Sequence, residues 1–561
     1  MNQKIVKIFT EMAELLGMKE VAFKPAAYEN AAASINHLDL ELNALYKKGG
    51  VGALQEIPGI GKGMAEKIEE YIKTGRIKEY DQLKKKMPVN IFELTAVEGV
   101  GPKMIKLFYE KLKIRNLKDL EKAAKAGKIS KLPRCGEKFE QKILKGIEFL
   151  KKHGGRFLLG DVYFLAKQLE KKYGGVIAGS FRRRQETVGD LDILIPALRP
   201  AVGEKRKTIY FENGLKSDLR FIDKKSWGSA LQYFTGDKEH NIALRKIAIA
   251  KGYKLNEYDL WDIRYPTNRY TVGKTEEEVY KKLGMQWIPP EIRRNEGEIE
   301  LAQKNKLPEL VELKDIKGDL HCHSHWKINR GLMEERVKKA VEMGYQYLGI
   351  SDHTKFLAIE HGLDEKELLE QSKQIKNLNK KFKKIIILHG CEANIMTDGS
   401  IDIDDEVLAK LDYVIVGVHS QMNMPEKEMT ERIIMAMRNP HVDIISHLTG
   451  RIIHRRQEFQ LDLDKILRVA KETGTVLEIN SNPARLDLKD VYIKKAKEAG
   501  VKMIINSDAH QNDQLELMEF GVGQARRGWA EKKDIINTMP LEKILEFFKK
   551  PKNPPRAGFN Y

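Results

Sequence analysis

Seven short apolar segments between residues 318 and 510 alternate with helical segments, and nearly every one ends in His, Asp or Glu. They read GDLHCH, YLGISDH, IIILHGCEAN, DYVIVGVHS, HVDIISH, VLEIN and MIINSDAH. Strands that alternate with helices pair in parallel, either in an open doubly wound sheet or in a closed barrel. Catalytic groups at the carboxyl ends of successive strands are typical of the active face of a β/α barrel. The pattern therefore predicts such a barrel with a functional site at one mouth.

Length and composition narrow the class of protein. The 561 residues suffice for roughly three to five domains, and no apolar run approaches the ~18 residues of a membrane span. The first twenty residues include acidic side chains and lack the apolar stretch of a secretory signal. The chain's three cysteines have no CxxC spacing, which excludes a disulfide framework. We therefore expect a cytoplasmic protein without membrane contact.

The charge is positive and unevenly spread. Lys and Arg outnumber Asp and Glu by 99 to 81, a net charge of +18. Residues 1–100 are balanced, whereas residues 101–150 hold 14 basic and 6 acidic side chains. A block of this kind attracts polyanions, nucleic acid above all. A solvated, lysine-rich surface is the plainer alternative.

The composition and the predicted helices and strands change along the chain and divide it into five segments. Residues 1–90 read as short helices, residues 91–155 as basic helices, and residues 156–288 contain strand-like runs such as DLDILI, KTIYFENGL and SDLRFI. Residues 289–315 form a charged, Pro-containing linker, and residues 316–561 hold the barrel pattern. The sequence thus predicts a multidomain protein with helical, α+β and α/β parts.

A weak internal repeat runs through the helical part. IPGIGKGMAEKI at 57–68 is echoed by VEGVGPKMIKLF at 97–108 and more loosely by LPRCGEKFEQKI at 132–143, where we expect Cys135 to replace a glycine and to be structural. The paired glycines (Gly59 and Gly61, then Gly99 and Gly101) permit a tight turn before a helix start, where free backbone N–H groups can meet a phosphate. We interpret the repeats as helix-hairpin-helix elements that bind the DNA backbone. A simple helix–helix turn is the alternative.

Asp190 and Asp192 stand two residues apart on a predicted strand, so both carboxylates lie on one face. A second strand supplies Asp218. Clustered carboxylates repel one another unless divalent cations lie between them, which indicates Mg²⁺ or Mn²⁺. Upstream, the run GSFRRR offers backbone N–H groups, a hydroxyl and guanidinium groups, which suit a triphosphate and in-line nucleotidyl transfer. Solvated or helix-capping aspartates are the alternative.

These residues resemble family X DNA polymerases, the nucleotidyltransferases that include repair polymerase beta. The resemblance rests on GSFRRRQETVGDLDIL, SDLR and ALQYFTGDKEHNIALR and covers residues 1 to about 290. It implies an 8-kDa-like domain with a helix-hairpin-helix at 1–90, fingers with a second one at 91–155, and a palm with a small thumb at 156–288. It also implies that Asp190, Asp192 and Asp218 are catalytic and hold two Mg²⁺ or Mn²⁺ ions.

The same resemblance implies substrate-binding positions. Those for the incoming nucleotide are Gly179, Ser180, Arg183 and the less certain helper Arg156 at the triphosphate, Tyr233, Phe234 and Gly236 at the sugar, and Asn241 and Arg245 at the minor-groove side of the nascent pair. Those for DNA are the hairpin glycines together with Lys24 and Tyr28, which would hold a 5′-phosphate across a gap. Lys67 stands where a lyase would place its Schiff-base amine; a solvated lysine is the favoured alternative.

One departure from the family concerns the palm. Asp192 and Asp218 are only 26 positions apart, fewer than in the family members that place a helix between these strands. The connection between them contains Pro200 and Gly203, which disfavour a helix. We therefore expect a palm that keeps its carboxylates and lacks one covering element.

The barrel segment carries its own candidate ligands. His321 and His323 lie on one face of a strand, as do Asp508 and His510, and further acidic and histidine side chains end the intervening strands: Asp352, His353, Glu392, His419 and His447. So many strand ends converging on one barrel mouth indicate a metal site, whereas a single histidine would be structural. Mixed His and carboxylate ligands suit Zn²⁺, Mn²⁺ or Fe²⁺.

These motifs resemble the PHP (polymerase and histidinol phosphatase) domain, a (β/α)₇ barrel with a trinuclear metal centre. The resemblance implies a cluster of Mn²⁺ or Zn²⁺ ions and a 3′-to-5′ exonuclease or related phosphoesterase activity. It implies these ligands: His321, His323, His353, Glu392, His419, His447, Asp508 and His510. A further aspartate of the family is replaced by Ile328. His325 or Asn329 could substitute, but neither stands at the expected position, so one ion would be weakly held.

The sequence therefore predicts a monomeric DNA-repair polymerase that binds gapped or primer–template DNA and dNTPs, and whose barrel processes 3′ ends. Two alternatives stay open. The shortened palm could have lost synthesis, leaving a Mn²⁺-dependent nuclease that acts on DNA ends. Both sites could instead be impaired, leaving a DNA-binding scaffold.

Overall fold

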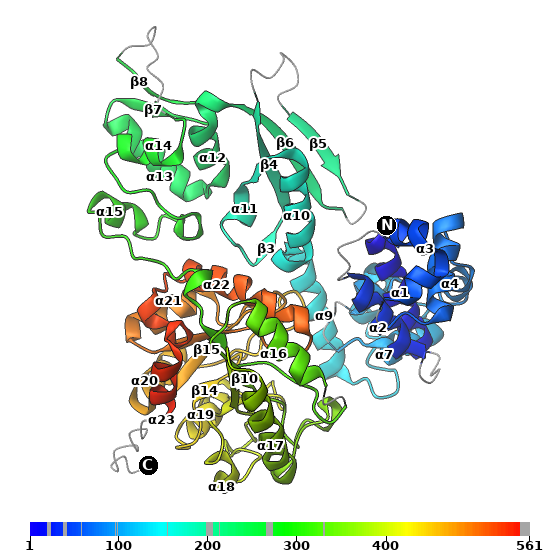
Figure 1. Cartoon of the computed structure of the whole chain (residues 1–561). Coiled ribbons are helices and arrows are strands. Elements are labelled where there is room, and N and C mark those ends of the chain that lie inside the picture. Colours follow the sequence, from blue (N-terminus) through cyan, green and yellow to red (C-terminus); the bar gives the residue numbers. More distant parts are fainter. Residues whose placement is uncertain are drawn as a thin grey trace. The chain divides into compact units, whose positions relative to one another are not determined.

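The computed structural model of the chain describes all residues except 19–23, 37–41, 58, 96, 98, 154, 198–205, 212–213, 265–272, 329–330 and 550–561. Its contacts define two compact units, Met1–Gly154 with His454–Arg456, and Gly155–Ile453 with Gln457–Tyr561 (Figure 1). The finer division into five segments stays a prediction. Among the described helices, none combines the length and the apolar character that a membrane crossing requires.

The first unit is helical and is built around one apolar core that extends from Ile5 to Ile147. Its helices are α1 (Asn2–Met18), α2 (Lys24–Asn36), α3 (Leu42–Gln55), α4 (Lys62–Thr74), α5 (Lys78–Lys86), α6 (Ile91–Thr95), α7 (Pro102–Leu112), α8 (Leu117–Lys125) and α9 (Glu137–His153). Helices such as α4, α7 and α8 are amphipathic and bury one apolar face.

Glycines start the two helices that follow the predicted hairpin turns. Gly59 and Gly99 have φ angles of 78° and 84°, in the left-handed region that favours glycine. Gly61 and Gly101 are the extended N-cap residues of α4 and α7. The backbone of both turns therefore has the conformation that the sequence predicts.

The third repeat adopts the same turn with different residues. Arg134, with a φ of 67°, takes the place of the first glycine. Cys135 is buried and its N–H donates to the Leu132 carbonyl at 3.0 Å, as the Ile60 N–H donates to Ile57. The expectation that Cys135 replaces a glycine was wrong, because it occupies the apolar position between the two glycine positions. Its structural role agrees with the prediction.

The second unit begins with a mixed sheet in the order β2-β4-β6-β5. Its strands are β2 (Val176–Ile177), β4 (Asp190–Ala197), β5 (Arg206–Tyr210) and β6 (Lys216–Asp223). Helices α10 (Leu159–Tyr173) and α12 (Trp227–Thr235) pack against this sheet. Between β4 and β6 the described residues form strand β5 and no helix, as expected; Pro200 and Gly203 lie outside the described residues.

The segment that follows packs short elements around its own apolar cluster, from Leu244 to Leu310. Its elements are α13 (Lys238–Ala250), β7 (Tyr253–Leu255), β8 (Leu260–Asp262), α14 (Glu276–Lys282) and α15 (Glu298–Gln303). Arg293 is fully buried in it and donates to Glu276 at 2.7 Å. This buried ion pair connects the end of the segment to α14.

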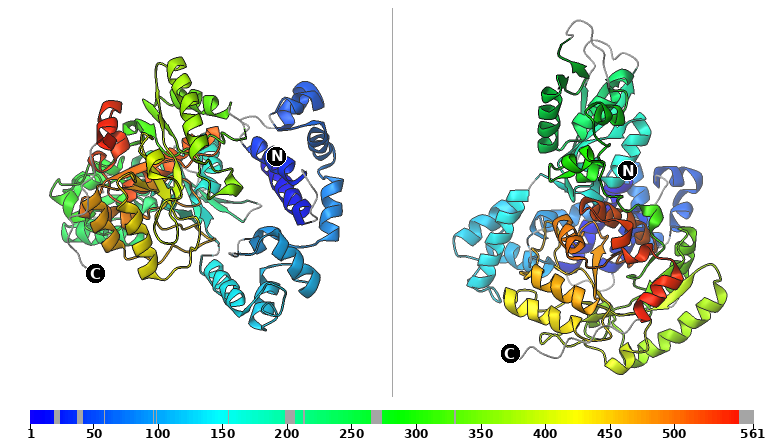
Figure 2. Two further views of the ribbon diagram at one scale, coloured as in Figure 1. Left: turned by 90° about the horizontal axis from the view of Figure 1, so that it is seen from below. Right: turned by 90° about the vertical axis from the view of Figure 1, so that its left-hand side faces the viewer.

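The strands after residue 316 form a three-stranded and a five-stranded sheet, which bridges between Cys322 and Ala509 and between His353 and Glu392 join into a closed β/α barrel (two further views of the fold in Figure 2). They are β9 (Gly318–Asp319), β10 (Tyr347–Ile350), β11 (Ile386–His389), β12 (Glu392–Asn394), β13 (Ile415–Gly417), β14 (Ile444–Ile445), β15 (Val476–Asn480) and β16 (Met503–Asn506). All strand pairs are parallel, and the bridge between Cys322 and Ala509 joins the segment that follows β9 to the segment that follows β16. The described strands form the seven predicted units, because β11 and β12 belong to one segment.

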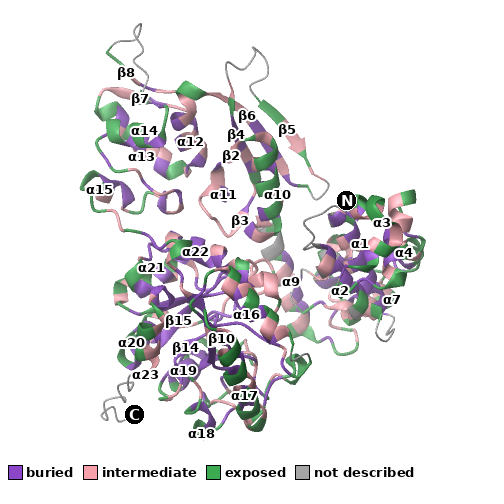
Figure 3. Ribbon diagram, viewed as in Figure 1, coloured by how far each residue is buried: buried purple, intermediate pink, exposed green. Residues whose placement is uncertain are grey.

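Alternate residues of the strands fill the barrel interior. Inward residues such as Leu388 and Ile504 form one apolar cluster, and their outward neighbours belong to another. The barrel strands are buried (purple in Figure 3). The Tyr413 ring lies across this interior, and its hydroxyl donates to the Leu320 carbonyl at 2.6 Å. A Cβ added at Gly349 or at Gly390 would lie 2.1 Å or 2.4 Å from Tyr413 atoms. Glycine at both positions therefore makes room for the ring.

Candidate metal centres

Glu392, on β12, is the centre of a cluster at the carboxyl ends of the barrel strands. Its Oε2 lies 2.9 Å from His353 Nδ1 and 3.3 Å from His321 Nε2. Its Oε1 lies 3.0 Å from His447 Nε2 and 3.5 Å from His419 Nε2. One fully buried carboxylate thus faces four imidazoles that four different segments supply.

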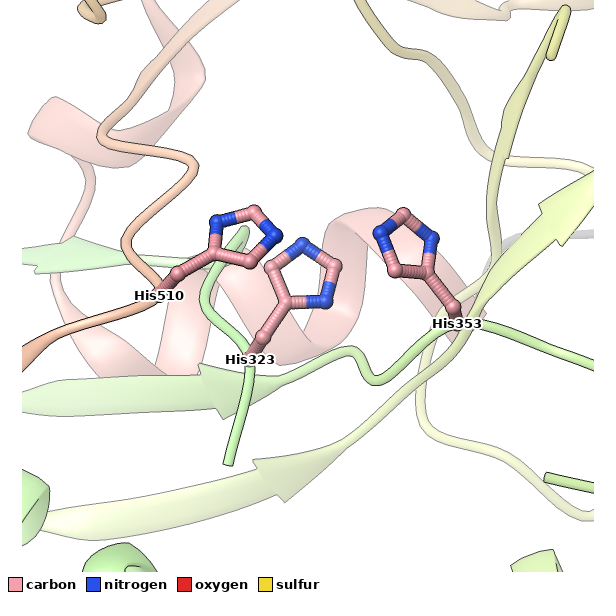
Figure 4. Close-up of side chains that lie close together, drawn as sticks. All are labelled: His323, His353 and His510. Carbon is pink, nitrogen blue, oxygen red and sulfur yellow. The ribbon is translucent and has the colours of Figure 1, made fainter. Parts of the chain in front are cut away.

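Asp508 completes the cluster. Its Oδ1 lies 3.2 Å from His323 Nε2 and 3.5 Å from His321 Nε2. The ring of His323 lies between those of His353 and His510, with centroids 4.3 and 4.1 Å away (Figure 4). The structure thus brings all eight predicted barrel ligands to one place.

The donor set of this cluster fits divalent metal ions. Several buried ligand atoms have no hydrogen-bond partner: His321 Nε2, His323 Nδ1, His353 Nδ1, His419 Nε2 and Glu392 Oε2. Three sets of three ligand atoms lie within 4.8 Å of one another: His323, His353 and His510; His321, His323 and Asp508; and His353, Glu392 and His419. Buried polar atoms are rarely left unpaired, and imidazole with carboxylate is a typical donor set for transition metals.

Burial and neighbouring charges move the pKa values in this cluster apart. Burial, together with the charges of His510 and His353, holds the pKa of His323 well below its usual value. Burial alone would raise the pKa of Glu392, but the surrounding histidines hold it well below its usual value. A neutral His323 and an ionised Glu392 are the protonation states that metal binding needs.

Glu478 and Asn480 support the ligands, and the sequence analysis missed both. Glu478 Oε1 lies 2.6 Å from His321 Nδ1, and the Asn480 amide donates to Asp508 Oδ2 at 3.0 Å. Partners of this kind fix the orientation of a metal ligand. The alternation in VLEIN could have identified them, because it places Val476, Glu478 and Asn480 on the inward face of β15.

The position of the ninth family ligand remains without a metal-binding side chain. Ile328 lies on a turn with an exposed fraction of 61%. His325 is not part of the close groups of ligand atoms among the described residues, and its Nε2 lies 3.0 Å from the backbone oxygen of His510. Asn329 lies outside the described residues. Asp352, which ends β10, is occupied by hydrogen bonds from Ser324 and Gln371 rather than by the cluster.

The palm strands place two of the predicted carboxylates in register. In the parallel pair of β4 and β6, Asp192 lies opposite Asp218, and Asp190 lies two residues earlier on β4. Burial and the charges of Asp192 and Asp218 raise the pKa of Asp190. Among the described residues, the three carboxylates do not form a group as close as those of the barrel.

Basic side chains bind two of the palm carboxylates. Asp218 accepts from Arg206 Nη2 at 2.6 Å and from Lys216 Nζ at 2.9 Å, while Asp192 accepts from Arg220 Nε at 2.8 Å. Burial alone would raise the pKa of Asp218, but hydrogen bonds from Thr208, Lys216 and Arg206 hold it below its usual value. Asp192 and Asp218 therefore pair with cationic side chains, whereas the barrel ligands face one another.

Several residues assigned to the triphosphate lie beside the palm carboxylates. Gly179 begins the short helix α11 (Gly179–Arg182), and its φ of 62° is in the left-handed region. A Cβ added there would lie 3.9 Å from Asp192 Oδ2. Ser180 follows it on α11. The Arg183 guanidinium lies 3.0 Å from a Cβ built at Gly236, and burial lowers its pKa to about 10.

The sugar and minor-groove candidates lie on α12 and α13. Tyr233 and Phe234 pack edge to face with ring centroids 5.2 Å apart. The Asn241 amide donates to the Tyr233 carbonyl at 2.7 Å, and Arg245 Nε donates to the Asn241 carbonyl at 3.3 Å. These four residues therefore lie on neighbouring turns of adjoining helices.

Arg156 is placed differently from the other nucleotide candidates. Its guanidinium donates to the hydroxyl and the carbonyl of Thr187 at 2.9 and 2.6 Å. A Cβ added at Gly189 would lie 3.2 Å from Arg156 Nη1. The Arg156 side chain is thus hydrogen-bonded to the strand that precedes Asp190.

The 5′-phosphate candidates of the first unit surround one carboxylate. Glu79 lies 3.1 Å from Lys67 Nζ, 3.7 Å from Lys24 Nζ and 3.3 Å from the Tyr28 hydroxyl. The Lys67 side chain is 23% exposed, so it is not the freely solvated lysine of the alternative hypothesis. Sequence spacing gave no sign of Glu79, because the contact joins α2, α4 and α5.

Four family models match the chain. They are a helix-hairpin-helix domain at residues 1–77, a SAM-like helix-hairpin-helix tandem at 91–148, the DNA polymerase beta thumb at 230–294, and the PHP domain at 319–482. The DNA polymerase/3′-5′ exonuclease PolX of Bacillus subtilis is 35% identical over 98% of this chain and 99% of its own length. The chain belongs to the family X DNA polymerases that carry a PHP domain.

A second relative matches a smaller share of the chain. A probable phosphatase of Thermoanaerobacter sp. is 31% identical over 42% of this chain and 95% of its own length. Membership of family X, with helix-hairpin-helix, polymerase beta-like and PHP parts, confirms the predicted fold class. Polymerases and PHP nucleases use divalent metal ions, so the chain is a divalent-metal-dependent enzyme.

Proposed function

We propose that the chain fills short gaps in DNA with its palm and trims 3′ ends with its barrel. The observation that carries the proposal is the coexistence of two sets of metal-binding side chains in one unit. Asp192 and Asp218 lie in register on β4 and β6, and Glu392 joins four histidines at the barrel mouth. The substrates we infer are primer–template or gapped DNA and dNTPs.

In the palm, Asp190, Asp192 and Asp218 would hold two divalent ions, for which we favour Mg²⁺ or Mn²⁺. Ions bound there would stabilise charge on the phosphate that is transferred. The cations that now neutralise Asp192 and Asp218 must then release them. Gly179 and Ser180 would donate hydrogen bonds to the triphosphate, and Arg183 would offset its charge.

In the barrel, the eight gathered ligands would hold a cluster of Mn²⁺ or Zn²⁺ ions. Such ions activate water and stabilise a phosphoester under attack. Glu478 orients His321 through its Nδ1, and Asn480 orients Asp508. The missing ninth ligand at Ile328 implies a cluster with one weakly held ion.

The hairpin elements of the first unit would hold the DNA backbone. Gly61 and Gly101 are the N-caps of α4 and α7 and supply no side-chain cap. With the turns at Gly59 and Gly99, the N–H groups of these helix starts would bind phosphates. The Lys24, Tyr28 and Lys67 cluster around Glu79 would receive a downstream 5′-phosphate. Lyase chemistry at Lys67 is part of the same proposal.

The experiment uses a 5′-labelled primer on a one-nucleotide gap with a downstream 5′-phosphate, in Mn²⁺, with and without dNTPs. We compare the wild type with Asp190→Ala and His419→Ala. Extension should disappear only in Asp190→Ala, and primer shortening only in His419→Ala. Shortening without extension in the wild type would refute gap filling and favour the nuclease alternative.

A further inference from the structure

The segment that carries the triphosphate candidates is attached to the PHP barrel by three of the residues that follow Ser180, namely Arg183, Arg184 and Glu186. It comprises α11 and the loop from Arg183 to Glu186, before β3 (Thr187–Val188). Its counterpart in the barrel is α22 (Met518–Arg527), which follows the strand and loop that carry Asp508. Both belong to the second unit (Figure 1).

Arg184 makes the central contact. Its guanidinium donates to Glu519 of α22, and the same carboxylate accepts from the Tyr163 hydroxyl of α10. The guanidinium also lies 5.5 Å from the centre of the Tyr163 ring. A Cβ built at Gly523 would lie 3.2 Å from Arg184 Cγ, so the Arg184 side chain packs tightly against this position of α22. A φ of 53° holds the Arg184 backbone in the left-handed region.

Two further contacts flank this one. Arg527, at the end of α22, donates to the backbone carbonyl of Arg183 at 3.1 Å. Glu186 accepts from Arg451 at 2.5 and 3.1 Å and from the Gln524 amide at 2.8 Å. Residues 183, 184 and 186 are thus each bonded to the barrel side of the unit.

The contact region is buried and partly apolar, so its hydrogen bonds and ion pairs determine how the segment is held. Arg451, Arg527 and Gln524 are at most 5% exposed. Phe520 of α22 packs against Tyr163 with ring centroids 4.9 Å apart, within the apolar core of the palm. Burial opposes ionisation of Glu519, but the charge of Arg184 lowers its pKa. Charged hydrogen bonds in such surroundings hold their groups in one geometry.

We propose that α22 and Arg451 position the nucleotide-binding segment, so that PHP residues determine how tightly the polymerase site holds a dNTP. Glu519 is in this view a positioning residue that acts through Arg184 on Gly179, Ser180 and Arg183. Arg451 lies four residues after the predicted ligand His447, so the contact also connects the two candidate metal centres along the chain. The inference rests on the proposed role of residues 179–183.

The test measures KM for dNTP and kcat of gap filling, together with the rate of primer shortening, in Glu519→Gln. The matched control is Glu516→Gln, which removes a carboxylate of the same region whose ion pair, to Lys339, lies within the barrel. KM should rise about tenfold in Glu519→Gln, as expected for one charge-assisted hydrogen bond. The value of kcat and the nuclease rate should change less than about twofold, and the control should match the wild type.

Tyr163→Phe and Ser180→Ala make the outcomes distinguishable. Tyr163→Phe removes one hydrogen bond to Glu519 and retains the ring, so it should raise KM for dNTP even if Glu519→Gln does not fold. An unchanged KM in the Glu519 and Tyr163 variants, with a raised KM in Ser180→Ala, would overturn the positioning inference alone. An unchanged KM in Ser180→Ala would instead overturn the proposed nucleotide role of the segment. Equal losses of polymerase and nuclease activity would indicate general destabilisation and also overturn the inference.

Discussion

Replacing Glu79 by glutamine should strengthen the preference of the protein for gaps that carry a 5′-phosphate. The Glu79 carboxylate now occupies the centre of the Lys24, Tyr28 and Lys67 cluster, as a phosphate would. Burial opposes its ionisation, but Lys67, Lys24 and Tyr28 lower its pKa, so it is charged at neutral pH. A bound phosphate must therefore displace an anion that belongs to the protein.

The size of the effect follows from the contacts that displacement breaks. Two ion pairs, at 3.1 and 3.7 Å, join Glu79 to partly exposed lysines, and each such pair is worth about 0.2–1 kcal/mol. A glutamine still accepts from the Tyr28 hydroxyl, so that bond cancels in the comparison. The variant should gain about 0.4–2 kcal/mol for a phosphorylated gap, which is about 2- to 30-fold in affinity.

The assay measures Kd by fluorescence anisotropy for two gapped duplexes that differ only in the 5′-phosphate. The ratio of the two Kd values isolates the phosphate from other DNA contacts. The gain should shrink as salt is raised, because the pairs are exposed enough to be screened.

Glu69→Gln is the matched control for this prediction. Glu69 also accepts from a tyrosine, Tyr46 at 2.6 Å, and pairs with a lysine, Lys73 at 2.9 Å, within the same unit. Its Kd ratio should equal that of the wild type. A Glu79→Gln ratio that equals the control would refute the reasoning, since the carboxylate would then not compete with phosphate.

Three further predictions concern other parts of the chain. Glu392→Gln should lower bound metal, measured by elemental analysis, and reduce primer shortening at least about 100-fold, while extension persists; retained metal would contradict the assignment. Gly99→Ala should lower the free energy of unfolding by about 1–2 kcal/mol, because its φ of 84° disfavours a Cβ; Gly101→Ala, at an ordinary φ of −90°, should cost clearly less in the same denaturant titration. His240 and Glu298 form a buried pair at 2.7 Å; burial lowers the His240 pKa, and His240 lowers that of Glu298 against the effect of burial. Both pKa values are thus lower in the folded than in the unfolded state. The stability that this pair contributes is therefore present at neutral pH and is lost on acidification, from about pH 6.5 for His240 and about pH 4.5 for Glu298. A His240→Gln variant should show a flatter fall of melting temperature between pH 7.5 and 4.5.

The barrel and its eight gathered ligands could be predicted because strand ends are local features of a sequence. The polar residue that ends each short apolar run can be read directly from the sequence, and the parallel arrangement of the strands brings those residues to one mouth of the barrel. The alternation within a run is equally local, and it would have revealed Glu478 and Asn480 on the inward face of β15. The choice between an open sheet and a barrel was not local, because it depends on the pairing of the first strand with the last, residues 322 and 509.

The environment of the palm carboxylates could not be predicted in the same way. Arg206 reaches Asp218 only because β5 pairs antiparallel with β6 and places Thr208 opposite Asp218. No spacing in the sequence reveals that register. The contact of Arg184 with Glu519 is more distant still, 335 positions along the chain. Interactions of this kind depend on how helices and strands that are distant in the sequence pack together.

Tyr413 and the two glycines that face it have a consequence for how this sequence can change over time. Gly349 or Gly390 could accept a methyl group only after the aromatic ring had become smaller, since an added Cβ would lie 2.1 or 2.4 Å from its atoms. A smaller residue at 413 would in turn leave a void and an unpaired Leu320 carbonyl. Each single step is therefore unfavourable although a joint exchange is not. We expect these three positions, far apart in the chain, to be inherited as a set, and their substitutions to co-vary among descendants of this barrel.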